Sequence, residues 1–449
     1  MLMRTRNALI FLLIFTALLS ACNLNMSGAT STPGAVTTPT SPVNPASPTP
    51  PPETSTPAMA TATPTFPPVI TATPQPATAT PAVTLTSPPG VKIDVIKMID
   101  VDSGWAVGQY ISTTTDDILR TADGGNNWRA VTPPEPNRNG KHAVAFFLDA
   151  NHAWVNYSVQ PSGSPPAAFS VWRTTDGGAS WDPVSTSLSG LTMDSFTTSQ
   201  IGFSDANHGW LMSILGAGMS HTYFAIYTTV DGGASWTLVV SPDKNNADMA
   251  CSKSGVWFRD ADHGILSGNC YGVIKGLYLY STEDGGENWT PLALPAPASM
   301  SDAFTSESTA CGADAPYFFD GSHGMLMVTC ANMNEDQPSR WIYRTSDGGA
   351  SWGSSPMPRP YGGYYFLNPQ KGWYLGQTDP AAFSDVNVYQ TSDGGKNWDK
   401  VSGTQWGGVL YFVDENNGWV IAKSDSGQAF VRTYNGGLSY ALLTPHLAP

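Results

Sequence analysis

One octapeptide recurs along the chain, and this repeat constrains the fold more than any other feature of the sequence. It begins with Thr and carries Asp-Gly-Gly, or once Asn-Gly-Gly, at its centre. The copies occupy residues 121–128, 174–181, 229–236, 282–289, 345–352, 391–398 and 433–440. Their central residues are Asp123, Asp176, Asp231, Asp284, Asp347, Asp393 and Asn435. The first six copies end in Trp128, Trp181, Trp236, Trp289, Trp352 and Trp398, and the last ends in Tyr440. A repeat spaced by 42 to 63 residues indicates an array of similar supersecondary units.

Turn chemistry explains the order of residues inside the octapeptide. The Asp side chain can accept hydrogen bonds from backbone amides that follow it, and the glycines allow positive φ. The terminal Trp offers a large apolar surface to its own hairpin and to a neighbouring one. A short run rich in β-branched and aromatic residues precedes each close copy, so the octapeptide is expected to be a hairpin turn between two strands. It resembles the Asp-box, or BNR, motif.

A second motif alternates strictly with the first and predicts a second hairpin in each repeat. Its clearest copies have Phe, then Asp, then His-Gly or His-Ala, as in Phe203–Trp210 and Phe147–Trp154. The others occupy residues 99–105, 258–264, 319–324, 366–373 and 412–419. Two hairpins form a four-stranded antiparallel sheet, which is the blade of a propeller. Seven of each motif therefore predict an all-β fold, a single seven-bladed β-propeller of four-stranded antiparallel blades over residues 91–449. A β-sandwich does not account for a repeat of this length.

The N-terminus has the layout of an export signal. Arg4 and Arg6 precede an uncharged apolar run from Ala8 to Leu19, which is short for a membrane span. The following Leu19-Ser-Ala-Cys22 resembles a bacterial lipobox, and that resemblance makes residues 1–21 a lipoprotein signal peptide with lipidation at Cys22. An ordinary signal peptide with an unmodified Cys is the alternative. The predicted location is the extracytoplasmic face of a membrane or the cell surface.

Residues 22–90 are expected to form a disordered Thr/Pro-rich stalk. The segment contains one charged residue, Glu53, and too few apolar residues to form a core. Removing this segment and the signal leaves a propeller with a net charge near −15. An acidic domain without a basic run is a poor partner for nucleic acid.

Four cysteines remain in the propeller, and the repeat suggests how they pair. Cys251 and Cys270 flank one copy of the second motif, and Cys311 and Cys330 flank the next copy at the same spacing. Disulfides Cys251–Cys270 and Cys311–Cys330 are therefore predicted, as an oxidising exterior allows. Free buried thiols are the alternative.

Metal binding and glycoside hydrolysis are the two chemical alternatives to a purely structural role of these motifs. The recurring His152, His208, His263 and His323 suggest a metal, but one equivalent His per blade cannot reach ligand distances near ~2 Å, so no metal or cofactor is expected. Sialidases carry Asp-boxes, and a glycosidase needs two carboxylates at one bond. The six Glu of the folded part are expected in solvated turns or inter-strand loops: Glu135, Glu283, Glu287, Glu307, Glu335 and Glu415. The sialidase Arg-Ile-Pro motif is missing, and related xyloglucan-cleaving enzymes have two propellers.

Taken together, the two alternating motifs resemble those of the photosystem II stability/assembly factor family, whose members are seven-bladed, non-catalytic scaffolds. The resemblance implies a lipid-anchored binding propeller with no catalytic residues and with a membrane-protein or other extracytoplasmic protein partner. It also implies an arginine patch for that partner, and Arg120, Arg173, Arg344 and Arg432 share one position before the box. Pairing of these arginines with box carboxylates between blades is the alternative. A glycoside hydrolase or glycan-binding propeller is the second functional hypothesis.

Overall fold

The computed structural model describes residues 90–448 except 111–112, 137, 139, 160–166, 190, 192–194, 219–220, 245–246 and 271–274. The predicted signal peptide, the lipidation site Cys22 and the stalk up to residue 89 lie outside the described residues. Within the described residues the protein is entirely β-structure and turns, which confirms the predicted fold class. No helix there has the length and hydropathy to cross a membrane.

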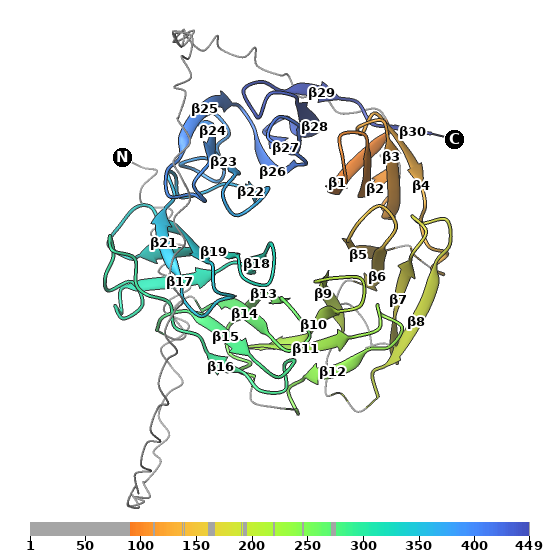
Figure 1. Ribbon diagram of the computed structural model, residues 1–449, viewed down its shortest axis with the longest axis horizontal. Helices are drawn as coiled ribbons and strands as arrows, with labels where there is room; N and C mark the ends of the chain where they lie inside the picture. The colour runs from red at the N-terminus through yellow and green to blue at the C-terminus, as the bar shows by residue number, and fades with distance from the viewer. Residues whose placement is uncertain are drawn as a thin grey trace, which may run out of the picture. The chain divides into compact units, whose positions relative to one another are not determined.

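The strands form seven consecutive blades arranged in a ring, and we refer to the centre of the ring as the channel (Figure 1). Blade 1 contains β1 (Val91–Met98), β2 (Ser103–Tyr110), β3 (Asp117–Ala122) and β4 (Asn127–Ala130), and blade 2 contains β5 (Lys141–Phe147), β6 (Ala153–Val159), β7 (Ala168–Thr174) and β8 (Asp182–Ser187). Blade 3 contains β9 (Thr197–Phe203), β10 (Gly209–Gly218), β11 (His221–Thr229) and β12 (Thr237–Val240), and blade 4 contains β13 (Ser252–Phe258), β14 (Gly264–Asn269), β15 (Tyr278–Thr282) and β16 (Thr290–Pro291).

Blade 5 has a first strand split in two, and it comprises β17 (Thr309–Ala313), β18 (Tyr317–Phe318), β19 (Gly324–Asn332), β20 (Ser339–Thr345) and β21 (Gly353–Pro356). Blade 6 contains β22 (Tyr364–Phe366), β23 (Gly372–Gly376), β24 (Val386–Thr391) and β25 (Asp399–Thr404), and blade 7 contains β26 (Gly407–Phe412), β27 (Gly418–Ser424), β28 (Gly427–Thr433) and β29 (Ala441–Leu443). In Figure 1 the first strand lies toward the centre of the ring and the fourth toward the rim, as β1 and β4 or β26 and β29 show, and in blade 5 β18 takes the inner position.

Both sequence motifs lie on one face of the ring. In each blade the second motif joins the first strand to the second, and the Asp-box joins the third strand to the fourth. Because the four strands are antiparallel neighbours, these two turns emerge at the same end of the blade. We call this end the motif face. The opposite face carries the connections between second and third strands and between blades.

Blades pack on each other through the apolar side chains of their sheet faces. The core is a series of clusters that each join two neighbouring blades, such as Trp210 of blade 3 with Phe258 and Trp289 of blade 4. Another cluster joins the ends of the ring, because Ile93 of β1 packs with Trp419 of β27. The short C-terminal strand β30 (His446–Leu447) adds to closure by pairing in parallel with β4. Sequence-distant blades 1 and 7 are thus direct neighbours.

Blades 4 and 5 share one backbone pairing and each contain a disulfide. A backbone pairing between Asn269 of β14 and Gly312 of β17 merges their strands into one nine-stranded sheet. Each of the two blades carries one disulfide, Cys251–Cys270 with Cα atoms 4.8 Å apart and Cys311–Cys330 with Cα atoms 4.1 Å apart. These are the pairs that the repeat spacing predicts.

Candidate functional site

The Asp-box carboxylates form hydrogen bonds within their own turns. In blade 2, Asp176 Oδ1 accepts hydrogen bonds from Thr174 Oγ1 at 2.7 Å and from the Ser180 amide at 2.9 Å, while Oδ2 accepts from Ser180 Oγ at 2.6 Å. The hydrogen bonds from Ser180 lower the pKa of Asp176 to about 2. The same contacts recur in the other boxes, and Asn435 reproduces them with its amide. These side chains close turns and are too acidic to serve as proton donors at neutral pH.

The box Trp side chains pack between the blades. The Trp128 and Trp289 indoles are buried, and each donates its N–H to a glycine carbonyl of its own box, at 2.9 and 3.0 Å respectively. Trp181 instead donates to the carbonyl of Val131 in the preceding connection at 2.7 Å. The octapeptide therefore encodes a turn together with the contact that seats one blade on the next.

The four candidate arginines hydrogen-bond to the motif turns of the next blade. Arg344 donates to Gly394 O at 3.0 Å, Arg173 donates to Asp231 O at 3.5 Å, and Arg120 donates to Ala150 O. Arg432 joins blade 7 to blade 1 by donating to Gly124 O at 3.4 Å and to Val101 O at 3.0 Å. These contacts hold the guanidinium groups at blade boundaries, as the alternative expected, but their acceptors are backbone carbonyls and not the box carboxylates.

The recurring histidines complete their own turns. His208 Nδ1 lies 2.8 Å from Asp205 Oδ2, and His263 Nδ1 lies 2.8 Å from Asp260 Oδ1, three residues earlier in each case. His152 and His323 make equivalent contacts with Asp149 and Asp320. Within the part of the chain that the structure describes, no group of three or more His, Cys, Asp or Glu residues is placed to hold a metal ion.

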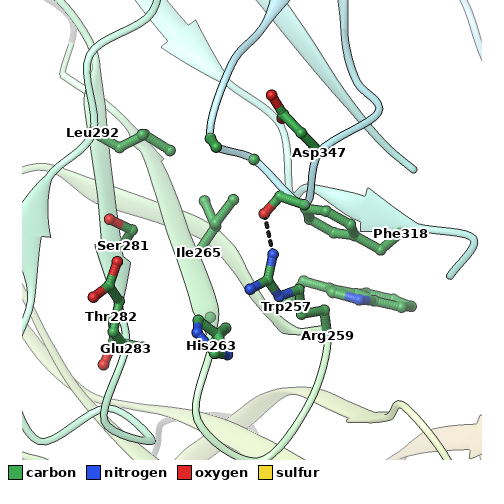
Figure 2. A pocket seen from close by; sticks show the side chains of 14 residues that line it. Trp257, Arg259, His263, Ile265, Ser281, Thr282, Glu283, Leu292, Phe318 and Asp347 are labelled. Atoms are coloured by element: carbon green, nitrogen blue, oxygen red, sulfur yellow. Dashed lines mark hydrogen bonds between the residues drawn. The ribbon is translucent and has the colours of Figure 1, made fainter. Parts of the chain in front are cut away.

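A groove of about 270 Å³ opens on the motif face between blades 4 and 5. Figure 2 shows Arg259 extending from the blade 4 turn toward the box that carries Asp347, and its guanidinium donates to Gly348 O at 2.5 Å. A groove of about 280 Å³ lies at the next boundary and is lined by the equivalent His323 and Asp393. Because the groove recurs with equivalent residues, we attribute it to the repeat and not to a unique binding site.

A second cavity, of about 310 Å³, is lined by aromatic side chains from several blades. Tyr317 of blade 5, Tyr365 of blade 6, Tyr411 of blade 7 and Lys97 of blade 1 contribute to its wall. Side chains from four different blades can meet only at the central channel. We call these four residues the channel cluster.

The channel cluster combines exposed ring surface with few charges. The Tyr365 and Tyr411 ring centroids are 4.9 Å apart, the Lys97 ammonium lies 5.5 Å from the Tyr411 centroid, and the Tyr317 side chain is 45% exposed. Burial raises the pKa of Tyr365 and of Tyr411 and lowers the pKa of Lys97. The tyrosines are therefore neutral hydroxyls on apolar rings, a surface suited to a hydroxylated ring ligand.

One carboxylate adjoins the wall of this cavity. Asp314 follows β17 and forms an ion pair with Arg340, with Oδ2 and Nη2 3.3 Å apart. The Arg340 guanidinium lies 5.6 Å from the ring centroid of Tyr364, which also lines the cavity. Burial, and after it the nearby charge of Asp314, raises the pKa of Tyr364. Asp314 is thus an acidic group in electrostatic contact with the aromatic wall.

Comparison with known proteins gives sequence relatives that are enzymes. The chain is 27% identical over 274 residues to a xyloglucanase from Paenibacillus sp, a match covering 55% of this chain and 24% of that enzyme. It is 25% identical over 267 residues to xyloglucanase Xgh74A from Acetivibrio thermocellus, covering 52% of this chain and 28% of that enzyme. The chain thus spans about a quarter of the length of these curated relatives. No family model matches it.

A solved structure supports the fold. The oligogalacturonate lyase from Vibrio parahaemolyticus superposes with a TM-score of 0.51 and 10% sequence identity, covering 77% of this chain and 90% of that protein. At this identity the likeness concerns the fold alone.

These relatives correct the function predicted from the sequence. The resemblance to photosystem II assembly factors is wrong, since the matching proteins are xyloglucanases. The prediction of a non-catalytic scaffold is wrong with it, the membrane-protein partner is not supported, and the second hypothesis fits better. The physical reason is that both motifs specify blade turns and blade contacts, which propellers of unrelated function share. Arg120, Arg173, Arg344 and Arg432 accordingly carry no argument for a protein partner.

The channel cluster was not predicted from the sequence, although the sequence contains a signal for it. Its residues directly precede the last residue of the first strand, and this position holds Lys97, Phe146, Gly202, Trp257, Tyr317, Tyr365 and Tyr411 in the seven blades. Aromatic residues therefore stand at five of these positions, and in four blades the aromatic residue directly precedes the Phe that begins the second motif. In blade 5 the motif begins one residue later, at Phe319.

Proposed function

We propose that this propeller is a glycan-active enzyme of the glycoside hydrolase class that acts on a neutral β-glucan chain such as xyloglucan. The observation that carries the proposal is the sequence similarity to two xyloglucanases over more than half of this chain. The channel cluster supports it, because its aromatic rings and neutral hydroxyls suit the apolar face and the hydroxyl edge of a sugar ring.

Charge favours a neutral polysaccharide over an acidic one. The propeller carries a net charge near −15, which repels polyuronates at moderate ionic strength. Lys97 supplies one positive charge to the channel cluster, and Arg340 is paired with Asp314. A neutral glucan reaches such a surface without an electrostatic penalty.

Hydrolysis of a glycosidic bond ordinarily uses two carboxyl groups, one as acid and one as base or nucleophile. We assign Asp314 to the second role, because it forms an ion pair with Arg340, whose guanidinium faces Tyr364 in the wall of the channel cavity.

The test is release of reducing ends from xyloglucan by the purified chain, with polygalacturonate as the charged control substrate. Xyloglucan is expected to be cleaved and polygalacturonate not. Asp314→Asn should lower kcat by at least about a hundredfold, in line with loss of a general base or nucleophile. Asp425→Asn, a change in the β27–β28 turn, serves as the matched control and should leave turnover unchanged.

Two results would contradict the proposal at different levels. If no neutral β-glucan is cleaved, the hydrolase assignment fails. If xyloglucan is cleaved equally well by the Asp314→Asn variant, the assignment of Asp314 fails while the activity stands.

A further inference from the structure

Aromatic side chains of four consecutive blades follow one another along the channel wall. Trp257 of β13 contacts Tyr317 of β18, with ring centroids 5.0 Å apart, and Tyr365 of β22 contacts Tyr411 of β26, with centroids 4.9 Å apart. Tyr317 and Tyr365 line the same cavity, which joins the two pairs. We call these four residues the aromatic arc. It extends over blades 4, 5, 6 and 7.

The arc lies where the channel opens on the motif face. Each of its residues directly precedes the last residue of a first strand, and that strand leads into a turn of the motif face. Because the four side chains stand at equivalent strand positions, they point to the same side of their sheets. Trp257 thus reaches the next blade at Tyr317, and Tyr365 reaches the next blade at Tyr411.

The arc is not a property of every repeat. In blade 3 the equivalent position is Gly202, where a Cβ atom would lie 2.3 Å from the Trp210 indole, so no side chain fits there. In blade 1 the equivalent position is Lys97, which follows Tyr411 around the ring. The continuous aromatic surface is therefore confined to one part of the channel wall, unlike the grooves that recur at the blade boundaries.

Ring surface of the arc is open to solvent. Tyr317 is 45% exposed, and the other three residues are half-buried. The two ring pairs have interplanar angles of 63° and 51°, so the rings do not cover each other's faces. Lys97 is the one charged side chain among the described residues that line the channel cavity. Such a wall favours a neutral ligand with apolar faces.

The arc is longer than the channel cavity. The cavity of about 310 Å³ is lined by the three tyrosines of the arc but not by Trp257. A ligand that only fills the cavity contacts the tyrosines, and it reaches Trp257 when it extends past Tyr317 toward blade 4. Trp257 is therefore placed to distinguish a long ligand from a short one.

We propose that the aromatic arc binds several consecutive sugar rings of one neutral β-glucan chain, with Trp257 contacting a residue that lies outside the channel cavity. This inference rests on the proposed function and adds to it a preference for longer chains. A row of aromatic rings along the wall matches the repeated apolar faces of a linear glucan, whereas a single sugar would occupy only part of the row.

The test is calorimetric titration of the purified chain with cellobiose, cellotriose, cellotetraose and cellopentaose, with chromatography to verify that each ligand stays intact. The affinity of the wild type is expected to rise with chain length. Trp257→Leu should weaken binding of cellopentaose about 3- to 10-fold, as loss of one aromatic contact predicts, and should leave binding of cellobiose unchanged. The length dependence of the wild type needs no variant and tests the same inference.

Phe146→Leu is the matched control. Phe146 stands at the equivalent strand position of blade 2, but its ring packs against Trp154 and Phe203, with centroid distances of 6.5 and 6.1 Å, and lies outside the arc. Both variants lose aromatic packing, so both are expected to unfold at a lower temperature. Only Trp257→Leu should change the dependence of affinity on chain length, which a purely structural role of Trp257 would not produce.

The inference is overturned if none of the oligosaccharides binds, or if the wild type binds cellobiose and cellopentaose equally well. It is also overturned if Trp257→Leu weakens binding of every length by the same factor. The hydrolase proposal is judged separately by release of reducing ends from xyloglucan. Cleavage without length-dependent binding would retain the enzyme and reject the arc, and length-dependent binding without cleavage would retain the arc and reject the enzyme.

Discussion

The closure of the ring offers a prediction whose size follows from the structure. Arg432 of β28 is 7% exposed and donates hydrogen bonds to Val101 O and Gly124 O of blade 1. Its guanidinium carbon also lies 4.5 Å from the Trp419 ring centroid. Two hydrogen bonds from a charged donor contribute about 3 kcal/mol, and a desolvated cation–π contact adds about 1 kcal/mol.

Replacing Arg432 by Met keeps most of the packing volume and removes these interactions. We expect Arg432→Met to lower the free energy of unfolding by about 3 kcal/mol, after allowing for apolar contacts that Met restores. Arg173→Met is the matched control, because it occupies the same repeat position and makes one hydrogen bond of 3.5 Å. Its expected cost is below about 1 kcal/mol.

Urea denaturation followed by Trp fluorescence measures both variants, because the Trp side chains are buried at blade boundaries. Equal destabilisation of Arg432→Met and Arg173→Met would refute the reasoning that the contacts across the closure, rather than the repeat position, set the magnitude.

Three further predictions concern the turns, the disulfides and the channel. The pKa of Asp176 is about 2 in the folded chain and near ~4 in the unfolded chain. Its stabilising contribution is therefore present above pH ~4 and is lost as the pH falls to ~2. Thermal melts should show this loss of stability at acid pH, and the loss should be smaller in Asp176→Asn. Replacing Cys311 and Cys330 together by Ala opens a link across a sequence separation of 19 and should cost about 3 kcal/mol in urea denaturation, and a cost near zero would contradict the bond. Tyr411→Ala should weaken binding of a xyloglucan oligosaccharide about 3- to 10-fold in affinity electrophoresis, as loss of one aromatic contact predicts, and unchanged binding would remove the channel cluster from the sugar site.

The architecture could be predicted from the sequence because the motifs are local. Each box fixes a turn by hydrogen bonds between residues at most four positions apart, as between Asp176 and Ser180. Counting such turns therefore counts the blades. The disulfide pairs were equally accessible, because the cysteines flank equivalent copies of one hairpin.

The sites were not accessible in the same way, because they depend on contacts between distant segments. The channel cluster brings together residues as far apart in the sequence as Lys97 and Tyr411. A local pattern can show that each blade carries such a residue, but it does not show that the side chains of four blades meet at one point. The function predicted from the sequence was wrong for a related reason. The repeated residues specify blade turns and blade contacts, which propellers of unrelated function share.

Blades 4 and 5 share one sheet, whereas each of the other blades belongs to a separate sheet. A nine-stranded sheet carrying two covalent cross-links should resist local opening as one cooperative unit. Its backbone amides should exchange with solvent more slowly than those of blade 6, which forms its own four-stranded sheet. Chain breaks introduced by circular permutation should accordingly be tolerated between other blades and poorly tolerated across this pair. We therefore expect the ring to open unevenly, with blades 4 and 5 exchanging together and more slowly than blades 6, 7 and 1.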